Sequence, residues 1–149
     1  MPITAPVLTS LLFAASAAAQ PAPDLAPADT VAYSRGVEAE NAGRHDEAIS
    51  DLTWAIALMP TFAGAYASRG VAYDQKGLYD RAIADYTRAL ALENGAVSTT
   101  IAETYFNRGA AYEHRRLYPR ALTDYRTALG LDPHLQAAQA GVKRLSKGR

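Results

Sequence analysis

Residues 63–96 read AGAYASRGVAYDQKGLYDRAIADYTRALALENGA, and this stretch decides the fold of the chain. Its apolar residues recur every three or four positions, which is the spacing of one face of an α-helix. Gly77 stands where a chain reversal favours a left-handed residue, and Asp80 follows where a second helix can start. The stretch therefore predicts two amphipathic helices joined by a tight turn.

The same pattern occurs on both sides of this stretch. An Arg-Gly pair is followed by an alanine, a large residue and a second alanine, at the same spacing in every copy. The glycine, alanine, large residue and alanine are Gly36, Ala48, Leu52 and Ala55, then Gly70, Ala82, Tyr86 and Ala89, then Gly109, Ala121, Tyr125 and Ala128. The third copy starts later than the first two predict, so residues 97–101 are an insertion before it. Such self-similarity is typical of a repeat protein.

The choice of residues has a physical reason. A glycine inside a helix costs about 1 kcal/mol relative to alanine, and it is tolerable where it lets a second helix approach closely. The small and large residues of the second helix alternate along a stripe that can interlock with that glycine. Each hairpin still has apolar surface that it cannot cover alone, so we expect the copies to stack.

The pattern resembles the tetratricopeptide repeat. The resemblance implies an all-α fold, a right-handed superhelical solenoid of helix-turn-helix repeats. It predicts a repeat domain over 29–149, with repeats at 29–62, 63–96 and 102–135 and a capping helix over 135–146. The chain departs from the family pattern at Ala39, Leu52, Asn94 and Arg116, where tyrosine, an aromatic residue, proline and glycine are usual.

The N-terminal residues predict export. An uncharged run over 7–19 ends in three alanines, so residues 1–19 are interpreted as a secretory signal peptide and the Pro/Ala-rich residues 20–28 as a flexible lead-in. The first six residues contain no Lys or Arg, which is atypical of a signal peptide. The alternatives are an Ala-rich leader or a start codon assigned too late. Cleavage after Ala19 would give a periplasmic or secreted protein.

Composition excludes several classes of function. The 15 basic residues balance 15 acidic residues, so no net field draws the chain to nucleic acid or to lipid. There is no cysteine, and the three histidines lack the spacing of a metal site. No phosphate-binding loop or nucleophile motif is present. We therefore expect no catalytic residues, no metal and no cofactor, and an envelope enzyme is the least favoured class.

The resemblance implies that the first helices of the repeats line a concave groove for a peptide or a partner helix. The candidate groove residues keep helical spacing beside the core stripe. They are Tyr33, Val37, Glu40 and Asn41, then Ala67, Val71, Asp74 and Gln75, then Glu103, Phe106, Ala110 and Glu113, with His114 beside them. Their centre is apolar and one edge is acidic, which favours an apolar segment with basic flanks. The alternative is a solvated helix face without a ligand.

One partner class of the family is not expected. Chaperone-binding members hold a C-terminal carboxylate with Lys, Asn, Asn, Lys and Arg, and this chain has Tyr33, Val37, Ser68, Glu103 and Asn107 at those positions. The functional hypothesis is a protein–protein interaction scaffold of the cell envelope. The alternative is a chaperone-like helper subunit for the folding or assembly of envelope proteins.

Two further features predict structure. Arg35, Arg69 and Arg108 each precede an aspartate at one fixed spacing, namely Asp51, Asp85 and Asp124, so we expect ion pairs between paired helices. The insertion, residues 97–101, either lengthens the first helix of the third repeat or forms a longer loop.

Overall fold

The computed structural model describes residues 27–93 and 98–147, and these form seven α-helices and no β-strand. The helices are α1 (Ala28–Asn41), α2 (His45–Leu58), α3 (Ala63–Gln75), α4 (Tyr79–Leu92), α5 (Ser98–His114), α6 (Tyr118–Leu131) and α7 (Gln136–Lys147). The predicted signal peptide and nearly all of the predicted lead-in lie outside the described residues.

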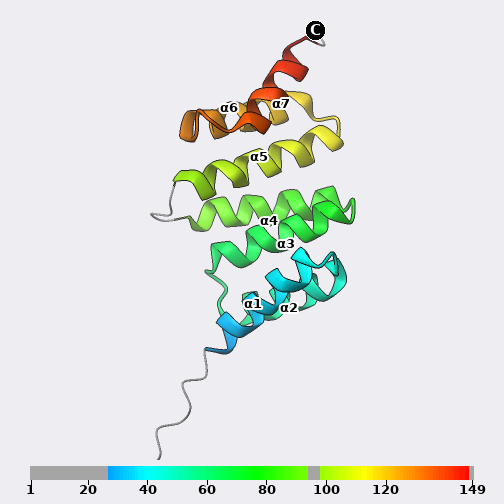
Figure 1. The fold of residues 1–149 in the computed structure, drawn as a ribbon, viewed down its shortest axis with the longest axis vertical. Coiled ribbons are helices and arrows are strands. Elements are labelled where there is room, and N and C mark those ends of the chain that lie inside the picture. The colour runs from blue at the N-terminus through cyan, green and yellow to red at the C-terminus, as the bar shows by residue number, and fades with distance from the viewer. Residues whose placement is uncertain (1–26, 94–97, 148–149) are drawn as a thin grey trace, which may run out of the picture.

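Three helical hairpins follow one another along the long axis of the molecule, and α7 covers the end of the last one (Figure 1). Each helix packs against its neighbours in sequence, and α1, α3, α5 and α7 also contact one another in that order. The predicted all-α solenoid is confirmed. The predicted capping helix is α7, which begins and ends one residue later than expected. Within the described ranges, no helix is both long and apolar enough to span a membrane.

The core confirms the role expected for the helix glycines. A Cβ atom added to Gly70 would lie 2.7 Å from the ring of Tyr86, which is 1% exposed. A Cβ atom on Gly109 would lie 2.9 Å from the ring of Tyr125, and one on Gly36 would lie 2.6 Å from Leu52. The absence of a side chain therefore lets the two helices of each hairpin approach closely enough to bury one large residue.

The turns within the hairpins share one backbone conformation. Gly43 and Gly77 both have φ at 71°, and Arg116 takes the same place in the third hairpin with φ at 59°. A left-handed conformation is unfavourable for a residue with a side chain, so this turn of the third hairpin is strained by about 1 kcal/mol.

The two aspartates expected at the starts of the second helices have a different role. Asp46 and Asp80 are second residues of α2 and α4, and the helix-capping positions are Arg44 and Leu78, whose side chains make no capping bond. The Asp46 carboxylate forms an ion pair with Lys76, and Asp80 pairs with Arg115 at 2.8 Å. Each aspartate therefore connects its hairpin to the next.

The insertion before the third repeat extends a helix. α5 has 17 residues, whereas α1 has 14 and α3 has 13. Residues 98–101 form the extra first turn of α5, so the alternative of a longer loop is wrong for this part of the insertion.

Candidate functional site

The predicted groove residues lie on three helices that touch one another. α3 lies between α1 and α5 in contact with both, and we call the set of candidate residues on these three helices the groove. Asn41, Gln75, Glu103 and the neighbouring His114 are exposed, and the other candidates are half-buried. Two of the half-buried candidates, Tyr33 and Val71, pack against buried core residues, which accounts for part of their burial.

A cavity marks the C-terminal end of this groove. Its volume is about 630 Å³. α5 lines it with Phe106, Ala110, Glu113 and His114, α7 lines it with Ala137, Ala140 and Arg144, and Arg116, Tyr118 and Tyr125 complete it. Sequence reasoning missed the contribution of α7. The signal was present, because Ala140 and Arg144 stand one repeat length beyond Phe106 and Ala110 and so occupy the groove positions of a first helix.

The Glu113 carboxylate is fully engaged within the chain. Arg144 Nε donates to Oε1 at 2.8 Å and Arg144 Nη2 donates to Oε2 at 2.7 Å. The Tyr125 hydroxyl also donates to Oε2, at 2.8 Å. The bonds from Arg144 and from Tyr125 hold the pKa of Glu113 below its ordinary value. Glu113 was expected to contribute to an acidic edge, but its charge is neutralised by Arg144.

Asp74 occupies the same repeat position as Glu113 but lacks such partners. The residue is half-buried, and its Oδ1 atom is buried without a hydrogen-bond partner among the described residues. Burial raises the pKa of Asp74, and the charge of His114 opposes that shift. A buried carboxylate oxygen without a hydrogen-bond donor is costly to the folded chain.

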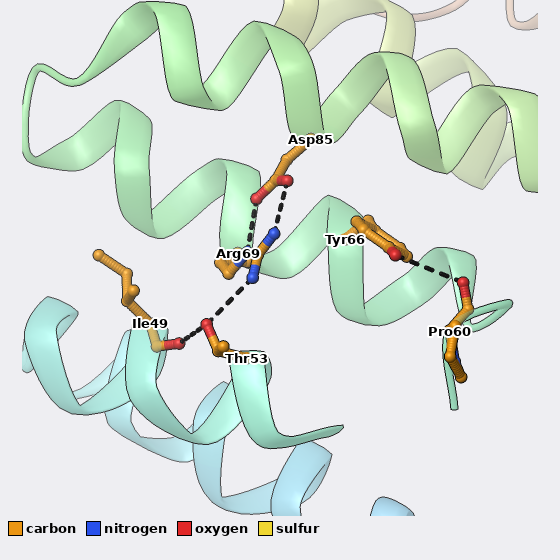
Figure 2. A network of polar contacts seen from close by, with 6 residues as sticks. All are labelled: Ile49, Thr53, Pro60, Tyr66, Arg69 and Asp85. Atoms are coloured by element: carbon orange, nitrogen blue, oxygen red, sulfur yellow. Dashed lines mark hydrogen bonds and ion pairs between the residues drawn. The ribbon is translucent and has the colours of Figure 1, made fainter. Parts of the chain in front are cut away.

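The predicted ion pairs are confirmed, and they hold the helices together. Arg69 Nε and Nη2 donate to the two carboxylate oxygens of Asp85 at 2.7 and 2.9 Å, and Arg69 Nη1 reaches Thr53 Oγ1 of the preceding hairpin at 3.0 Å (Figure 2). Arg108 repeats the arrangement with Asp124 and Thr87. The three Arg–Asp pairs, including Arg35–Asp51 at 2.9 Å, are called the arginine seam.

The first pair of the arginine seam is much more exposed than the other two. The Arg69 guanidinium lies 5.7 Å from the ring centroids of both Tyr66 and Tyr73. The first repeat has Ala32 and Ala39 instead of these tyrosines. The Arg35 side chain is 66% exposed, whereas that of Arg69 is 16% exposed. The tyrosines therefore desolvate the ion pair of the second repeat.

The groove residues combine an apolar centre with carboxylates and, at one end, cationic side chains. In the part of the chain that the structure describes, no three His, Cys, Asp or Glu residues come together as metal ligands would.

The family model for the tetratricopeptide repeat matches residues 63–94 and 102–135. Among curated protein sequences, none matches this chain. Solved structures with the same fold are numerous, and two of the most similar illustrate them. The TPR domain of Arabidopsis OM64 is 29% identical with a TM-score of 0.75, over 82% of this chain and 97% of that one. The first TPR domain of RPAP3 (Spaghetti), bound to the HSP90 peptide SRMEEVD, is 25% identical with a TM-score of 0.74, over 80% of this chain and 91% of that one.

A third structure shows the fold alone, because its identity is lower. It is the TPR2B domain of yeast Sti1 in complex with an Hsp70 peptide, 20% identical with a TM-score of 0.72. The match covers 82% of this chain and 98% of the yeast domain.

Proposed function

Because this chain belongs to the tetratricopeptide repeat family, with three repeats and a capping helix, we propose that it is a protein-interaction module. The groove holds a segment of another protein against α1, α3 and α5. One observation carries this proposal: the row of half-buried apolar and acidic side chains that ends in a cavity of about 630 Å³. The peptide complex of the RPAP3 domain supports it, since that domain has the same fold and holds a peptide.

The chemistry of the groove favours a different peptide from that one. The RPAP3 ligand SRMEEVD carries two glutamates and an aspartate. This chain has no basic residue at the five carboxylate-holding positions, and Glu103 occupies one of them. We infer that the partner is an apolar segment with basic residues beside it and that a C-terminal carboxylate is not held at these positions.

The setting of this function is the cell envelope. Export by the predicted signal peptide places the protein in the periplasm or outside the cell, where it acts as a non-enzymatic scaffold. The second candidate, a helper that holds folding or assembling envelope proteins, uses the same groove. The two differ in the number of partners: a scaffold has one dominant partner, and a helper has many unfolded clients.

Site-specific crosslinking in the source cell tests these statements together. A photo-crosslinking residue at Val71 lies in the groove, and the matched control at Ala57 is exposed on α2, outside it. We expect covalent products from position 71 that position 57 does not give, and mass spectrometry then separates one partner from many clients. Identical products from both positions would contradict the groove function.

The same sample tests export. We expect the mature N-terminus to be Gln20. An intact Met1 in the soluble cytoplasmic fraction would contradict export and leave the groove function intact.

A further inference from the structure

The zero net charge of the chain conceals a separation of charge along the solenoid. Residues 27–93 contain ten acidic and six basic residues, whereas residues 98–147 contain eight basic and four acidic residues. These ranges occupy opposite ends of the long axis, with α1 at one end and α7 at the other (Figure 1). A partner that lies along this axis therefore meets a negative electrostatic potential at the α1 end and a positive one at the α7 end.

The groove carries the same separation. Its unengaged acids, Glu40 and Asp74, lie on α1 and α3, and Arg116 lies beside the cavity at the other end. None of the three takes part in an ion pair among the residues that the structure describes.

No ion pair to Asp74 is formed among the described residues, although the charge of His114 acts on its carboxylate. Lys76, two positions along, pairs with Asp46, and Arg115 pairs with Asp80. The Asp74 carboxylate therefore has no charge-assisted hydrogen bond within the part of the chain that the structure describes.

The chain itself contains a precedent for how a basic group binds at this repeat position. Arg144 of α7 crosses the end of the groove and donates two hydrogen bonds to Glu113. Glu113 holds the position in the third repeat that Asp74 holds in the second. A Lys or Arg of the partner would do for Asp74 what Arg144 does for Glu113. Charge-assisted hydrogen bonds of this kind are among the strongest that a peptide can make.

We propose that the groove binds its partner in one direction only. A Lys or Arg of the partner segment bonds to Asp74, an Asp or Glu of the same segment bonds to Arg116, and apolar residues between them cover Val71, Ala110 and Phe106. This inference rests on the proposed groove function and adds polarity to it. Reversing the segment would place like charges together at both ends, which is the basis of selectivity.

A second copy of this chain is a less suitable occupant of the charged ends. For another repeat to stack on α1, the exposed Glu38 would have to be buried. In α3 and α5 the corresponding residues are the buried alanines Ala72 and Ala111. The carboxylate at this position therefore opposes end-to-end stacking of copies.

Selection from a library of random dodecapeptides tests the proposal on the full chain. We expect enriched peptides to carry a basic and an acidic residue on opposite sides of an apolar stretch. Asp74→Asn should weaken their binding about tenfold, and Arg116→Gln should weaken it about threefold because that guanidinium is exposed. Glu38→Gln, an exposed change on α1 outside the groove residues, is the matched control and should bind as the parent does.

The direction is read by NMR. A spin label at the basic end of an enriched peptide should broaden the amide signals of α3, and one at the acidic end should broaden those of α7.

Peptides that bind in the groove without charge separation, or equally well to Asp74→Asn, would overturn the inference and leave the proposed function standing. Failure to enrich any groove-binding peptide would overturn both. Sedimentation could instead show self-association that is sensitive to salt and reduced by Asp74→Asn. The charged ends would then serve contacts between copies of this chain, and the inference would be overturned.

Discussion

The arginine seam and the groove use the same kinds of residue to opposite effect. In the seam, Asp85 receives two hydrogen bonds from Arg69, and the guanidinium also reaches Thr53. In the groove, Asp74 has a buried oxygen that receives none. The carboxylate that receives donors holds the repeats together, whereas Asp74 lacks such a donor, and we infer that a partner supplies one to this residue. The position of a carboxylate in the repeat thus says less about its role than its donors do.

The largest expected effect concerns the seam. Asp85→Ala leaves the Arg69 guanidinium mostly buried without its partner, so we expect the free energy of unfolding to fall by about 3 kcal/mol. Asp51→Ala is the matched control, and it should cost less than about 1 kcal/mol because the Arg35 side chain is 66% exposed. Urea denaturation measures both. Equal losses would show that the flanking tyrosines of the second repeat do not strengthen its pair.

A smaller loss is expected at Glu113, the groove acid that Arg144 and Tyr125 engage. Glu113→Gln weakens the bonds from Arg144 and Tyr125, and stability should fall by about 1 kcal/mol. A double-mutant cycle with Arg144→Gln isolates the pair. Strictly additive losses would show that Glu113 and Arg144 do not interact in solution, and Glu113 would then return to the acidic edge of the groove.

Asp74→Asn should have the opposite sign. The substitution removes a half-buried charge that lacks a donor, so the unbound protein should gain up to about 1 kcal/mol of stability at neutral pH. Glu38→Gln, an exposed change on α1, should stay within about 0.5 kcal/mol of the parent. A loss of stability in Asp74→Asn would mean that Asp74 has a partner within the chain, and the contrast between seam and groove would fail.

The smallest effects appear as a pH dependence. Glu113 has a lowered pKa in the folded state, so the stability it contributes is present above its ordinary value of 4.5 and is lost as the pH falls through the folded value. Asp74 has a raised pKa, so its destabilising effect develops as the pH rises from 3.8 through the folded value. Thermal melts between about pH 3 and pH 7 span these ordinary values. At neutral pH, Glu113→Gln should melt below the parent and Asp74→Asn above it. At acid pH, both melting temperatures should converge on that of the parent. If the melting temperature of a variant ran parallel to that of the parent across this pH range, the pKa shift of the substituted residue would be contradicted.

Much of this structure follows from local pattern. The spacing of Gly70, Tyr86 and their counterparts predicted the hairpins, and glycine at position 77 predicted its turn, because these requirements lie within one repeat. The Arg144–Glu113 bond could not be predicted in that way. It joins residues of two helices whose approach depends on how the third repeat and α7 stack.

The contrast between Asp74 and Glu113 was hidden for the same reason. Equivalent positions in a repeat have equivalent neighbours only while the stack continues unchanged, and α7 ends it. Asp46 and Asp80 show the converse, since a residue suited to a helix start became a contact between repeats. Pattern predicts which face a side chain occupies, whereas its donor depends on the next element in space.

The stacking of hairpins in a line also determines how this protein should come apart. Each hairpin contacts only the one before and the one after, so opening can begin at an end and spread inward. The first hairpin has a neighbour on one side, an exposed seam pair, and alanines in place of two tyrosines. Amide hydrogens of α1 should therefore exchange with solvent sooner than those of α4. The acidic end of the groove would then belong to the part of the molecule that opens most often, and a bound segment would slow that opening.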